Sequence, residues 1–510
     1  MAGLPIMFLL LTAILLWLIR RSHIRVLWMV SLAGVFASWL SILILTYALP
    51  LQFVFLRGQT DTHNTILRLD LTSWPFVLIL STLFLSSLLS TFTNRNEFAW
   101  KFAFQFMVVA AAGLAAAMAG NVLSFVLSWS VLDLTILAIG LNNARDESEW
   151  MQAIQKFGFR AAAIILLMVA ELLNRNAGGT EDLRDIRSFA VFGCLFIVLL
   201  LRSGKFGKDV SLGKWQPPAL SMQAILSRVA AFSLLARVLT SSFHPSIIAE
   251  LRIAGVAFAG WAIAALLING QLRKKRVDPG LIFLGVVLPM QAQSLHSPEP
   301  IAVNMGVLLI LLAGASRNLK TSRTWHMVII GTLALMIVGM PGSFGSALIR
   351  MATRIIQSQN LVGFWLLAPL VLILFGSRII VQGLDTIKEF DSRAAGPSVR
   401  ATFAMLLLPF SGFATLMVDR PITLAGAPIF IAMVGAMIIS LIALRRLKII
   451  PHANHYSELI SRTLRPLIRG MFLLFRQVVH GSAVLFEGET GMLWVYVILL
   501  FLFVTFGILS

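Results

Sequence analysis

The sequence has few of the residues from which metal and redox centres are built. It contains a single cysteine, Cys194, so disulfides, iron–sulfur clusters and multi-cysteine zinc sites are excluded within the chain. The eight histidines show no ligand spacing. We therefore expect no catalytic centre, no metal and no cofactor in this chain, and membership of an enzyme complex remains open.

Charged residues are scarce as well. They make up 12% of the 510 residues, whereas soluble domains carry about 25%. Hydrophobic residues make up 58%, and the mean hydropathy is +0.89. Continuous apolar runs such as Leu4–Ile19 and Met492–Leu509 are, with their flanks, about long enough to cross a hydrocarbon core some 30 Å thick. The runs do not alternate with period two, so they predict helices and an all-α polytopic membrane protein.

We expect about 14–16 transmembrane helices. The first run lacks a preceding basic region and a cleavage site, so it reads as a spanning helix and not as a signal peptide. The expected spans are 4–20, 26–48, 71–92, 101–119, 121–141, 157–173, 188–203, 217–239, 247–269, 279–295, 301–315, 325–341, 361–384, 399–418, 423–444 and 488–509.

The net charge of +19 has two explanations, binding to nucleic acid or membrane topology. Topology explains it better, because basic residues collect in alternate connections and cytoplasmic loops of membrane proteins are rich in Lys and Arg. These clusters are Arg20, Arg21 and Arg25; Arg95 and Lys101; Lys205, Lys208 and Lys214; and Arg273–Arg276. All four fall inside if the N-terminus lies outside. The sequence thus predicts a multi-pass protein of the cytoplasmic (inner) membrane, with lipids as partners and no nucleic acid.

Two helices are interrupted in the sequence. A polar stretch, Ser203–Pro218, ends at Pro217 and Pro218, and a second break lies around Pro341 and Gly342. Freed backbone is tolerated in a membrane only where protein buries it or a polar cavity hydrates it, so paired breaks indicate an ion or substrate path. Either break taken alone would more simply be a kink.

Residues 452–482 depart from the pattern of simple spans. Glu458, Arg462, Arg465, Arg469 and Arg476 recur at spacings that place them on one helix face. We expect a basic amphipathic helix lying along the membrane surface or along neighbouring subunits.

Charges inside spans are costly and are candidates for function. Asp133 is the clearest, since it lies in the middle of a span with Ser130 one turn earlier. A structural ion pair with an arginine of a neighbouring helix explains Asp133 equally well. Arg202, Arg237 and Arg378 lie near helix ends, where we expect their side chains to reach the headgroups.

Six segments, read in order over roughly residues 65 to 420, resemble the antiporter-like subunits of respiratory complex I and of Mrp-type cation/proton antiporters. They are Leu67–Asp70 with Ser73 and Trp74; Gly120–Leu123 through Ser128 and Trp129; Leu199–Gly204; Trp215–Leu239, ending in Leu234–Arg237; Gly255–Val277; and Gly339–Pro341 with Gly345. Single motifs are weak, but six in order are specific. The resemblance implies two inverted five-helix repeats, each with one broken helix.

The sequence departs from the family where the family carries its proton relay. Ser130 stands in place of the usual Glu, Arg202 in place of a Lys, and Gln223 and Val229 in place of His and Lys; Ile349 replaces a further Lys. The remaining candidates for an ion path are Asp133, Ser130, Arg202, Gln223, Arg228 and Arg350. Arginine keeps its proton at physiological pH, so the usual Glu–Lys relay is expected to be largely lost.

The resemblance implies three regions: N-terminal helices over 1–64, an antiporter-like core over 65–420, and a C-terminal region over 421–510 with a helix, the lateral helix and a final span. It also implies a membrane subunit of a larger complex I-like or antiporter-like assembly, with other membrane subunits as partners. The alternative is a structural subunit that docks redox or inorganic-carbon-uptake partners without conducting protons. An independent secondary transporter fits least, because no substrate-sized set of polar residues converges.

Overall fold

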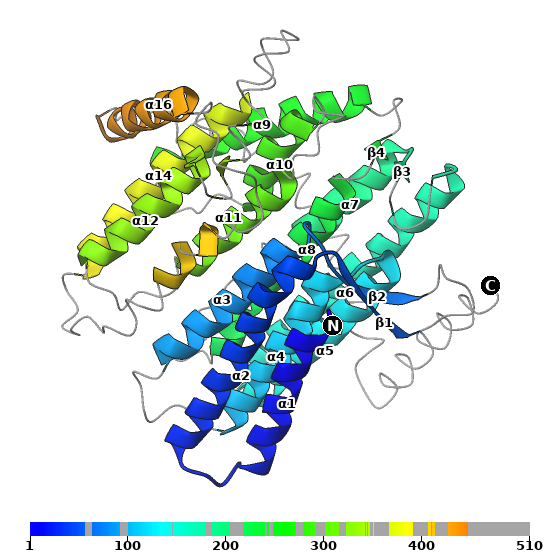
Figure 1. Cartoon of the computed structure of the whole chain (residues 1–510). Coiled ribbons are helices and arrows are strands. Elements are labelled where there is room, and N and C mark those ends of the chain that lie inside the picture. Colours follow the sequence, from blue (N-terminus) through cyan, green and yellow to red (C-terminus); the bar gives the residue numbers. More distant parts are fainter. Residues whose placement is uncertain are drawn as a thin grey trace.

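A computed structural model describes most of the chain. The described residues are 1–56, 64–91, 100–144, 146–179, 183, 185–202, 218–239, 242–243, 248–271, 279–291, 301–315, 323–341, 343, 345–346, 350, 367–390, 406–409, 411–413 and 427–446. They contain fourteen α-helices, one 3₁₀ helix and four short strands (Figure 1). The predicted lateral helix at 452–482 and final span at 488–509 lie outside these residues.

The first part of the chain forms one side of a helical bundle (Figure 1). Its elements are α1 (Leu4–Leu18), α2 (Ile24–Leu45), a 3₁₀ helix (Thr46–Ala48), β1 (Leu51–Leu56), β2 (Thr65–Leu69), α3 (Trp74–Thr91), α4 (Trp100–Met118), α5 (Val122–Asn143), α6 (Glu147–Asn176), β3 (Asp185–Ile186), α7 (Phe189–Arg202) and α8 (Pro218–Leu239). Helix α4 packs against α1, α5 and α8, and α6 packs against α5 and α7.

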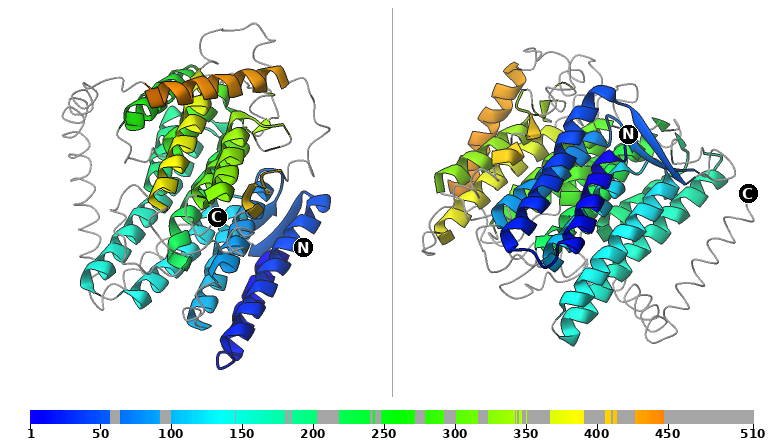
Figure 2. Two further views of the ribbon diagram at one scale, coloured as in Figure 1. Left: turned by 90° about the vertical axis from the view of Figure 1, so that its left-hand side faces the viewer. Right: turned by 60° about the horizontal axis from the view of Figure 1, so that its bottom comes forward.

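The second part forms the other side of the bundle. Its elements are β4 (Ser242–Phe243), α9 (Ile248–Gln271), α10 (Pro279–Gln291), α11 (Ile301–Ala315), α12 (Arg323–Val338), α14 (Leu367–Phe390) and α16 (Ala427–Arg446). The two sides meet where α11 packs against α3 and α8. Helix α16 packs on α12 and α14 at a steep angle (Figures 1 and 2).

Five helices are long and apolar enough to cross a membrane by length and composition. They are Ile24–Ala48, Trp100–Met118, Val122–Asn143, Glu147–Asn176 and Ala249–Leu267, and eight shorter apolar helices accompany them. The all-α, multi-pass architecture expected from the sequence is confirmed.

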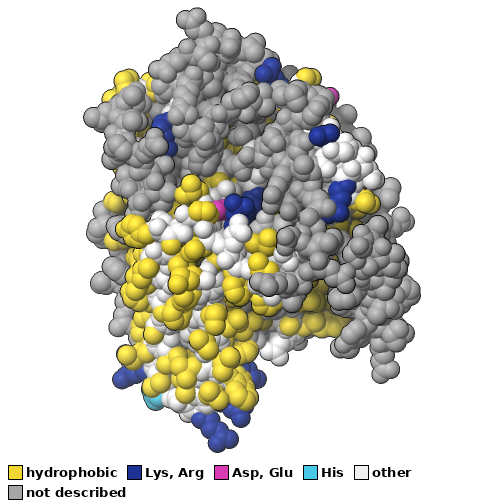
Figure 3. Space-filling view, turned by 45° about the vertical axis from the view of Figure 1, so that its right-hand side comes forward, with side chains coloured by type: hydrophobic (Ala, Val, Ile, Leu, Met, Phe, Trp, Pro, Cys, Tyr) yellow, Lys and Arg dark blue, Asp and Glu magenta, His cyan; other side chains and the backbone are white. Residues whose placement is uncertain are grey.

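The surface of the N-terminal helices fits this architecture. Large apolar side chains of α1 are exposed, among them Met7, Leu11, Ile14 and Leu18. Figure 3 shows hydrophobic side chains over this region and Lys and Arg side chains gathered at the end below it. At that end the guanidinium of Arg20 lies 5.6 Å from the ring centroid of Trp17. An apolar band that ends in an aromatic ring and basic residues is typical of a membrane boundary.

Helix α6 is longer than the sequence pattern predicted. It begins at Glu147 and not near residue 157, because Asp146 caps it: its carboxylate accepts the backbone N–H of Glu149 at 2.8 Å. That hydrogen bond, with a further one from the Ser148 hydroxyl, holds the pKa of Asp146 below its ordinary value. At about 1.5 Å per residue, the 30 residues of α6 span about 45 Å, which exceeds the hydrocarbon core.

A β-hairpin occupies the connection between α2 and α3, where the sequence pattern predicted only a loop. Strands β1 and β2 pair antiparallel, with Leu51 opposite Leu69. The hairpin is fixed to the turn between α4 and α5: Gly120 N–H donates to Ile66 O at 2.8 Å, and Asn121 Nδ2 donates to Asn64 O at 2.7 Å.

Both predicted interruptions fall at helix ends. Helix α7 ends at Arg202 and α8 begins at Pro218, while the intervening residues lie outside the described ones. Helix α12 ends at Val338, where Gly339 takes φ +108, a backbone angle that favours glycine. Pro341 follows in a turn, and Ser346 is helical again. The inverted-repeat relation between the two breaks stays a prediction.

Candidate functional site

The candidate site is built on one face of α5. Trp129 and Asp133 are four residues apart, which places them on the same side of the helix. Asp133 is 1% exposed and Trp129 is fully buried. Helices α6 and α7 follow α5 in the chain, and α6 packs against both α5 and α7.

Two arginines converge on Asp133. Arg202, the last residue of α7, is fully buried and donates a hydrogen bond from Nη2 to Asp133 Oδ2. Its guanidinium also stacks over Trp129, with Cζ 3.8 Å from the ring centroid. Arg160 of α6 places Nε 3.9 Å from Asp133 Oδ1. We call Trp129, Asp133, Arg160 and Arg202 the Asp133 cluster.

The cluster is not saturated with hydrogen bonds. In the described part of the chain, Arg202 Nε, Arg202 Nη1 and Asp133 Oδ1 have no hydrogen-bond partner. Buried polar atoms in this state are costly unless water or another group reaches them. The site therefore holds two positive charges, one negative charge and unused hydrogen-bonding capacity.

The structure tests two expectations, the ion pair of Asp133 and the position of the arginines near helix ends. Asp133 does form an ion pair with an arginine of a neighbouring helix, Arg202. The expectation that helix-end arginines reach the headgroups is wrong for Arg202, because Asp133 and the Trp129 ring hold its guanidinium inside the protein. It is also wrong for Arg378, which is 3% exposed. Arg237 forms an ion pair with Asp70 at 3.2 Å.

Two of the other candidates form hydrogen bonds elsewhere. Ser130 Oγ donates to Val126 O at 2.7 Å within α5, and Arg350 Nη1 donates to Ser346 Oγ at 3.2 Å. Arg228 is partly buried on α8. Pro217 and Gly342 lie outside the described parts of the chain, and so does the side chain of Gln223. Pro218 begins α8.

The sequence pattern did not single out Arg160, because the expected span began at residue 157, only three residues before it. A signal was present. Glu149, Gln152, Lys156 and Arg160 follow one another at spacings of three, four and four, which makes a polar stripe along one face of α6. Such a stripe in a helix that also carries an apolar run indicates a face turned toward polar neighbours.

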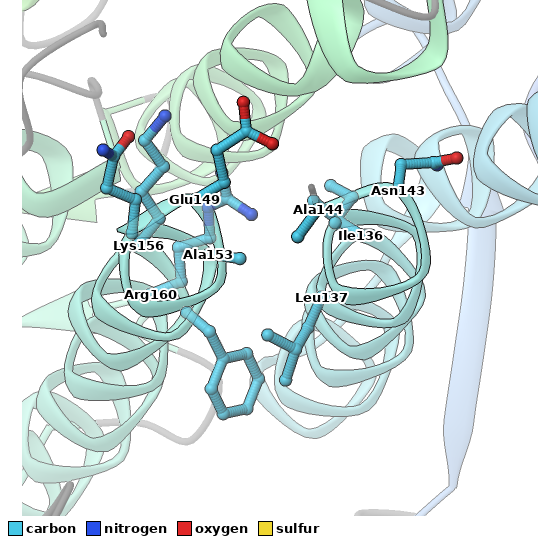
Figure 4. Close-up of a pocket in the computed structure, with 11 residues that line it drawn as sticks. Ile136, Leu137, Asn143, Ala144, Glu149, Ala153, Lys156 and Arg160 are labelled. Atoms are coloured by element: carbon cyan, nitrogen blue, oxygen red, sulfur yellow. The ribbon is translucent and has the colours of Figure 1, made fainter. Parts of the chain in front are cut away.

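This stripe lines a cavity between α5 and α6 (Figure 4). From α6 the cavity is lined by Glu149, Gln152, Ala153, Lys156, Phe157 and Arg160, and from α5 and its end by Ile136, Leu137, Gly140, Asn143 and Ala144. Its volume is about 40 Å³, which is room for a few water molecules. Arg160 belongs to both the cavity and the Asp133 cluster.

A second ionic group joins motifs that are far apart in the sequence. Asp70 Oδ2 lies 3.0 Å from Arg68 Nε and 3.2 Å from Arg237 Nη1. Its other oxygen accepts the backbone N–H groups of Thr72 and Ser73, at 3.1 and 2.9 Å, in the turn that leads into α3. This group ties the start of α3 to the end of α8.

Comparison with known proteins gives matches among structures. No protein-family model matches the sequence, and no curated protein sequence matches it. A chain of the membrane-bound sulfane sulfur reductase, an archaeal respiratory membrane complex, matches with a TM-score of 0.57 and 14% identity, over 98% of this chain and 99% of that one. A chain of the Mrp complex from Dietzia sp. DQ12-45-1b matches with a TM-score of 0.60 and 12% identity, over 100% of this chain and 63% of that one.

A chain of respiratory complex I from Thermus thermophilus with bound aureothin also matches. Its TM-score is 0.53 and its identity 16%, over 81% of this chain and 98% of that one. The chain has the fold of these antiporter-like membrane subunits. The resemblance drawn from six short motifs is thereby confirmed at the level of the fold, and each structural neighbour is one chain of a multi-subunit membrane complex.

Proposed function

We propose that this protein is an antiporter-like membrane subunit of a larger complex I-like or cation/proton antiporter-like assembly, in which the usual Glu–Lys proton relay is largely lost. Other membrane subunits and lipids are its partners in the cytoplasmic membrane. The fold shared with chains of three such complexes supports the general role.

The loss of the proton relay is proposed because the partner of Asp133 is an arginine, Arg202. A relay needs a group that can release and regain its proton, and arginine does not do so at physiological pH. Arg202 is fully buried, paired with Asp133 and stacked on Trp129, so both the charge and the position of the pair are fixed. The arrangement suits a scaffold better than a proton carrier.

A structural subunit that docks partner proteins without conducting protons is the second candidate. It is favoured by the same fixed ion pair, and by the exposed apolar side chains on α5 and α6, among them Val131, Ile165 and Leu172. Such side chains fit either lipid or a neighbouring membrane subunit.

Proton flux into liposomes tests the loss of the relay. Liposomes holding the purified chain should take up protons no faster than empty liposomes under an imposed membrane potential. The Asp133→Asn variant should behave as the unmodified chain does. Robust flux through the unmodified chain, above that of empty liposomes, would overturn both the loss of the relay and the structural-subunit reading, whether or not the Asp133→Asn variant folds.

The subunit role has its own test. The tagged chain, extracted from its native membrane in mild detergent, should migrate at a mass well above 56.0 kDa plus its micelle, together with other multi-pass proteins. Recovery of the chain alone, in detergents that preserve comparable complexes, would contradict the role.

A further inference from the structure

The polar residues that line the cavity between α5 and α6 become more buried along its length. Glu149, Gln152 and Lys156 are partly exposed, Arg160 is 7% exposed, and Asp133 behind it is 1% exposed. Arg160 follows Glu149 by eleven positions, which corresponds to about 16 Å along the helix. The polar lining therefore runs from the end of the helical hairpin toward the middle of α5.

The far end of the cavity is closed by apolar packing. Beyond Arg160, the next residues on this face of α6 are Ala163 and Leu167, and both are fully buried. From α5, Leu132 and Ile136 are 0% and 3% exposed. Figure 4 shows the labelled residues of α6 facing those of α5 across the space, with Glu149 and Arg160 on the α6 side.

Gln152 Oε1 on the cavity wall is buried and has no hydrogen-bond partner in the part of the chain that the structure describes, and leaving such an atom dry costs free energy. The cavity is large enough for water, and its polar lining supplies the partners that ordered water requires. Unsatisfied polar atoms of the Asp133 cluster lie just behind it.

We infer that this cavity is a water-filled vestibule, open on the side of the membrane where α5 joins α6 and closed by Arg160, which brings water next to the buried Asp133. Water is the ligand, and the vestibule ends inside the protein. The inference deepens the proposed function and rests on it, since it requires α5 and α6 to be embedded in a membrane.

Thiol labelling tests the vestibule, and the chain suits it because Cys194 is its single cysteine. Cys194→Ser provides the background. Leu137→Cys places a thiol on the cavity wall, whereas Ala138→Cys places one at almost the same depth on the exposed face of α5. Ala153→Cys probes the opposite wall on α6 and serves if Leu137→Cys folds poorly.

The measurement is the rate of reaction with a charged, membrane-impermeant methanethiosulfonate, in sealed native membrane vesicles of either orientation. Only a hydrated thiol ionises and reacts, so Leu137→Cys and Ala153→Cys should react at least about tenfold faster than Ala138→Cys. They should react from one side of the membrane only.

Two results would overturn the inference. Rates at Leu137→Cys and Ala153→Cys no higher than at Ala138→Cys would mean that the cavity holds no accessible water. Reaction from both sides would mean a continuous channel instead of a closed vestibule. Labelling does not depend on proton flux or on co-purification, so its failure is distinguishable from failure of the proposed function.

Discussion

Arg160 and Arg202 both approach one buried carboxylate, and the ring of Trp129 helps to stabilise the charge of Arg202. The face of the Trp129 ring carries partial negative charge, which favours the guanidinium that stacks on it. Removing Asp133 would leave the buried guanidinium of Arg202 with this weaker interaction.

Asp133→Asn should therefore destabilise the protein strongly. Removing one partner of a buried ion pair typically costs about 3–5 kcal/mol, because the remaining charge stays buried. The control is Glu147→Gln, which removes an exposed carboxylate in the first turn of α6 and should cost only about 0.3–1 kcal/mol. Thermal unfolding in one detergent compares the two, and equal losses of stability would contradict the assignment of the Asp133 cluster.

The sequence predicted the central residue of the site but not all of its neighbours. Asp133 was identifiable because a carboxylate in the middle of an apolar span is rare and costly. The ion pair with Arg202 required knowledge of how α5 and α7 are placed relative to each other by α6, which packs against both and which no local pattern reveals. Arg160 was missed for a different reason, since the cap at Asp146 extends α6 beyond its apolar run.

At the scale of elements, a turn and a hairpin hold together segments that are distant in the chain. Asp70 accepts two backbone N–H groups in the turn before α3 and pairs with Arg68 and Arg237. The strand that carries Arg68 is fixed to the α4–α5 turn by hydrogen bonds from Gly120 and Asn121. Three of the motifs that resembled the antiporter-like family therefore meet at one place.

Substitution of Asp70 should separate the two roles of its carboxylate. Asp70→Asn keeps an acceptor for the backbone N–H groups but removes the charge that pairs with Arg68 and Arg237. Asp70→Ala removes both, and it should destabilise by about 1–2 kcal/mol more than Asp70→Asn, since hydrogen bonds to buried or partly buried backbone donors are lost. The midpoint of thermal unfolding measures the order, and equal midpoints would show that the turn does not depend on this side chain.

The β1–β2 hairpin could not be predicted from the local pattern of apolar and polar residues. Helix positions followed from apolar runs, and the described helices agree with the expected spans over most of the chain. Strand β1 reads Leu-Gln-Phe-Val-Phe-Leu, which does not alternate cleanly between apolar and polar residues. Its partner strand and the α4–α5 turn that holds it come later in the chain, so its stability depends on tertiary contacts.

At the scale of the whole molecule, the distribution of charge predicts an orientation in the membrane. Arg20 and Arg21 lie in the α1–α2 connection and Arg25 in the first turn of α2, and basic connections typically stay in the cytoplasm. We expect the α1–α2 connection inside, and the N-terminus and the hairpin outside. In the Cys194→Ser background, Ser22→Cys should react with an impermeant maleimide only from the cytoplasmic face.

Tyr47, which is 88% exposed at the opposite end of α2, provides the complementary position. Tyr47→Cys should react only from the outer face. Reaction of both thiols from one face would show that α2 does not cross the membrane. Exchanged faces would reverse the topology and place the mouth of the vestibule outside.

The unequal charge count of the Asp133 cluster has an electrical consequence for the membrane. Within the Asp133 cluster itself, two guanidinium groups and one carboxylate sum to one positive charge, about 15 Å from either end of α5. At an effective dielectric constant of about 20, a cation 7 Å away is repelled by roughly 2 kcal/mol, which lowers its local concentration more than tenfold. We expect the vestibule to admit water but to exclude sodium, potassium and hydronium ions, as a fixed arginine does in pores that pass water but not cations. A membrane that contains this subunit should then lose no cations through the vestibule.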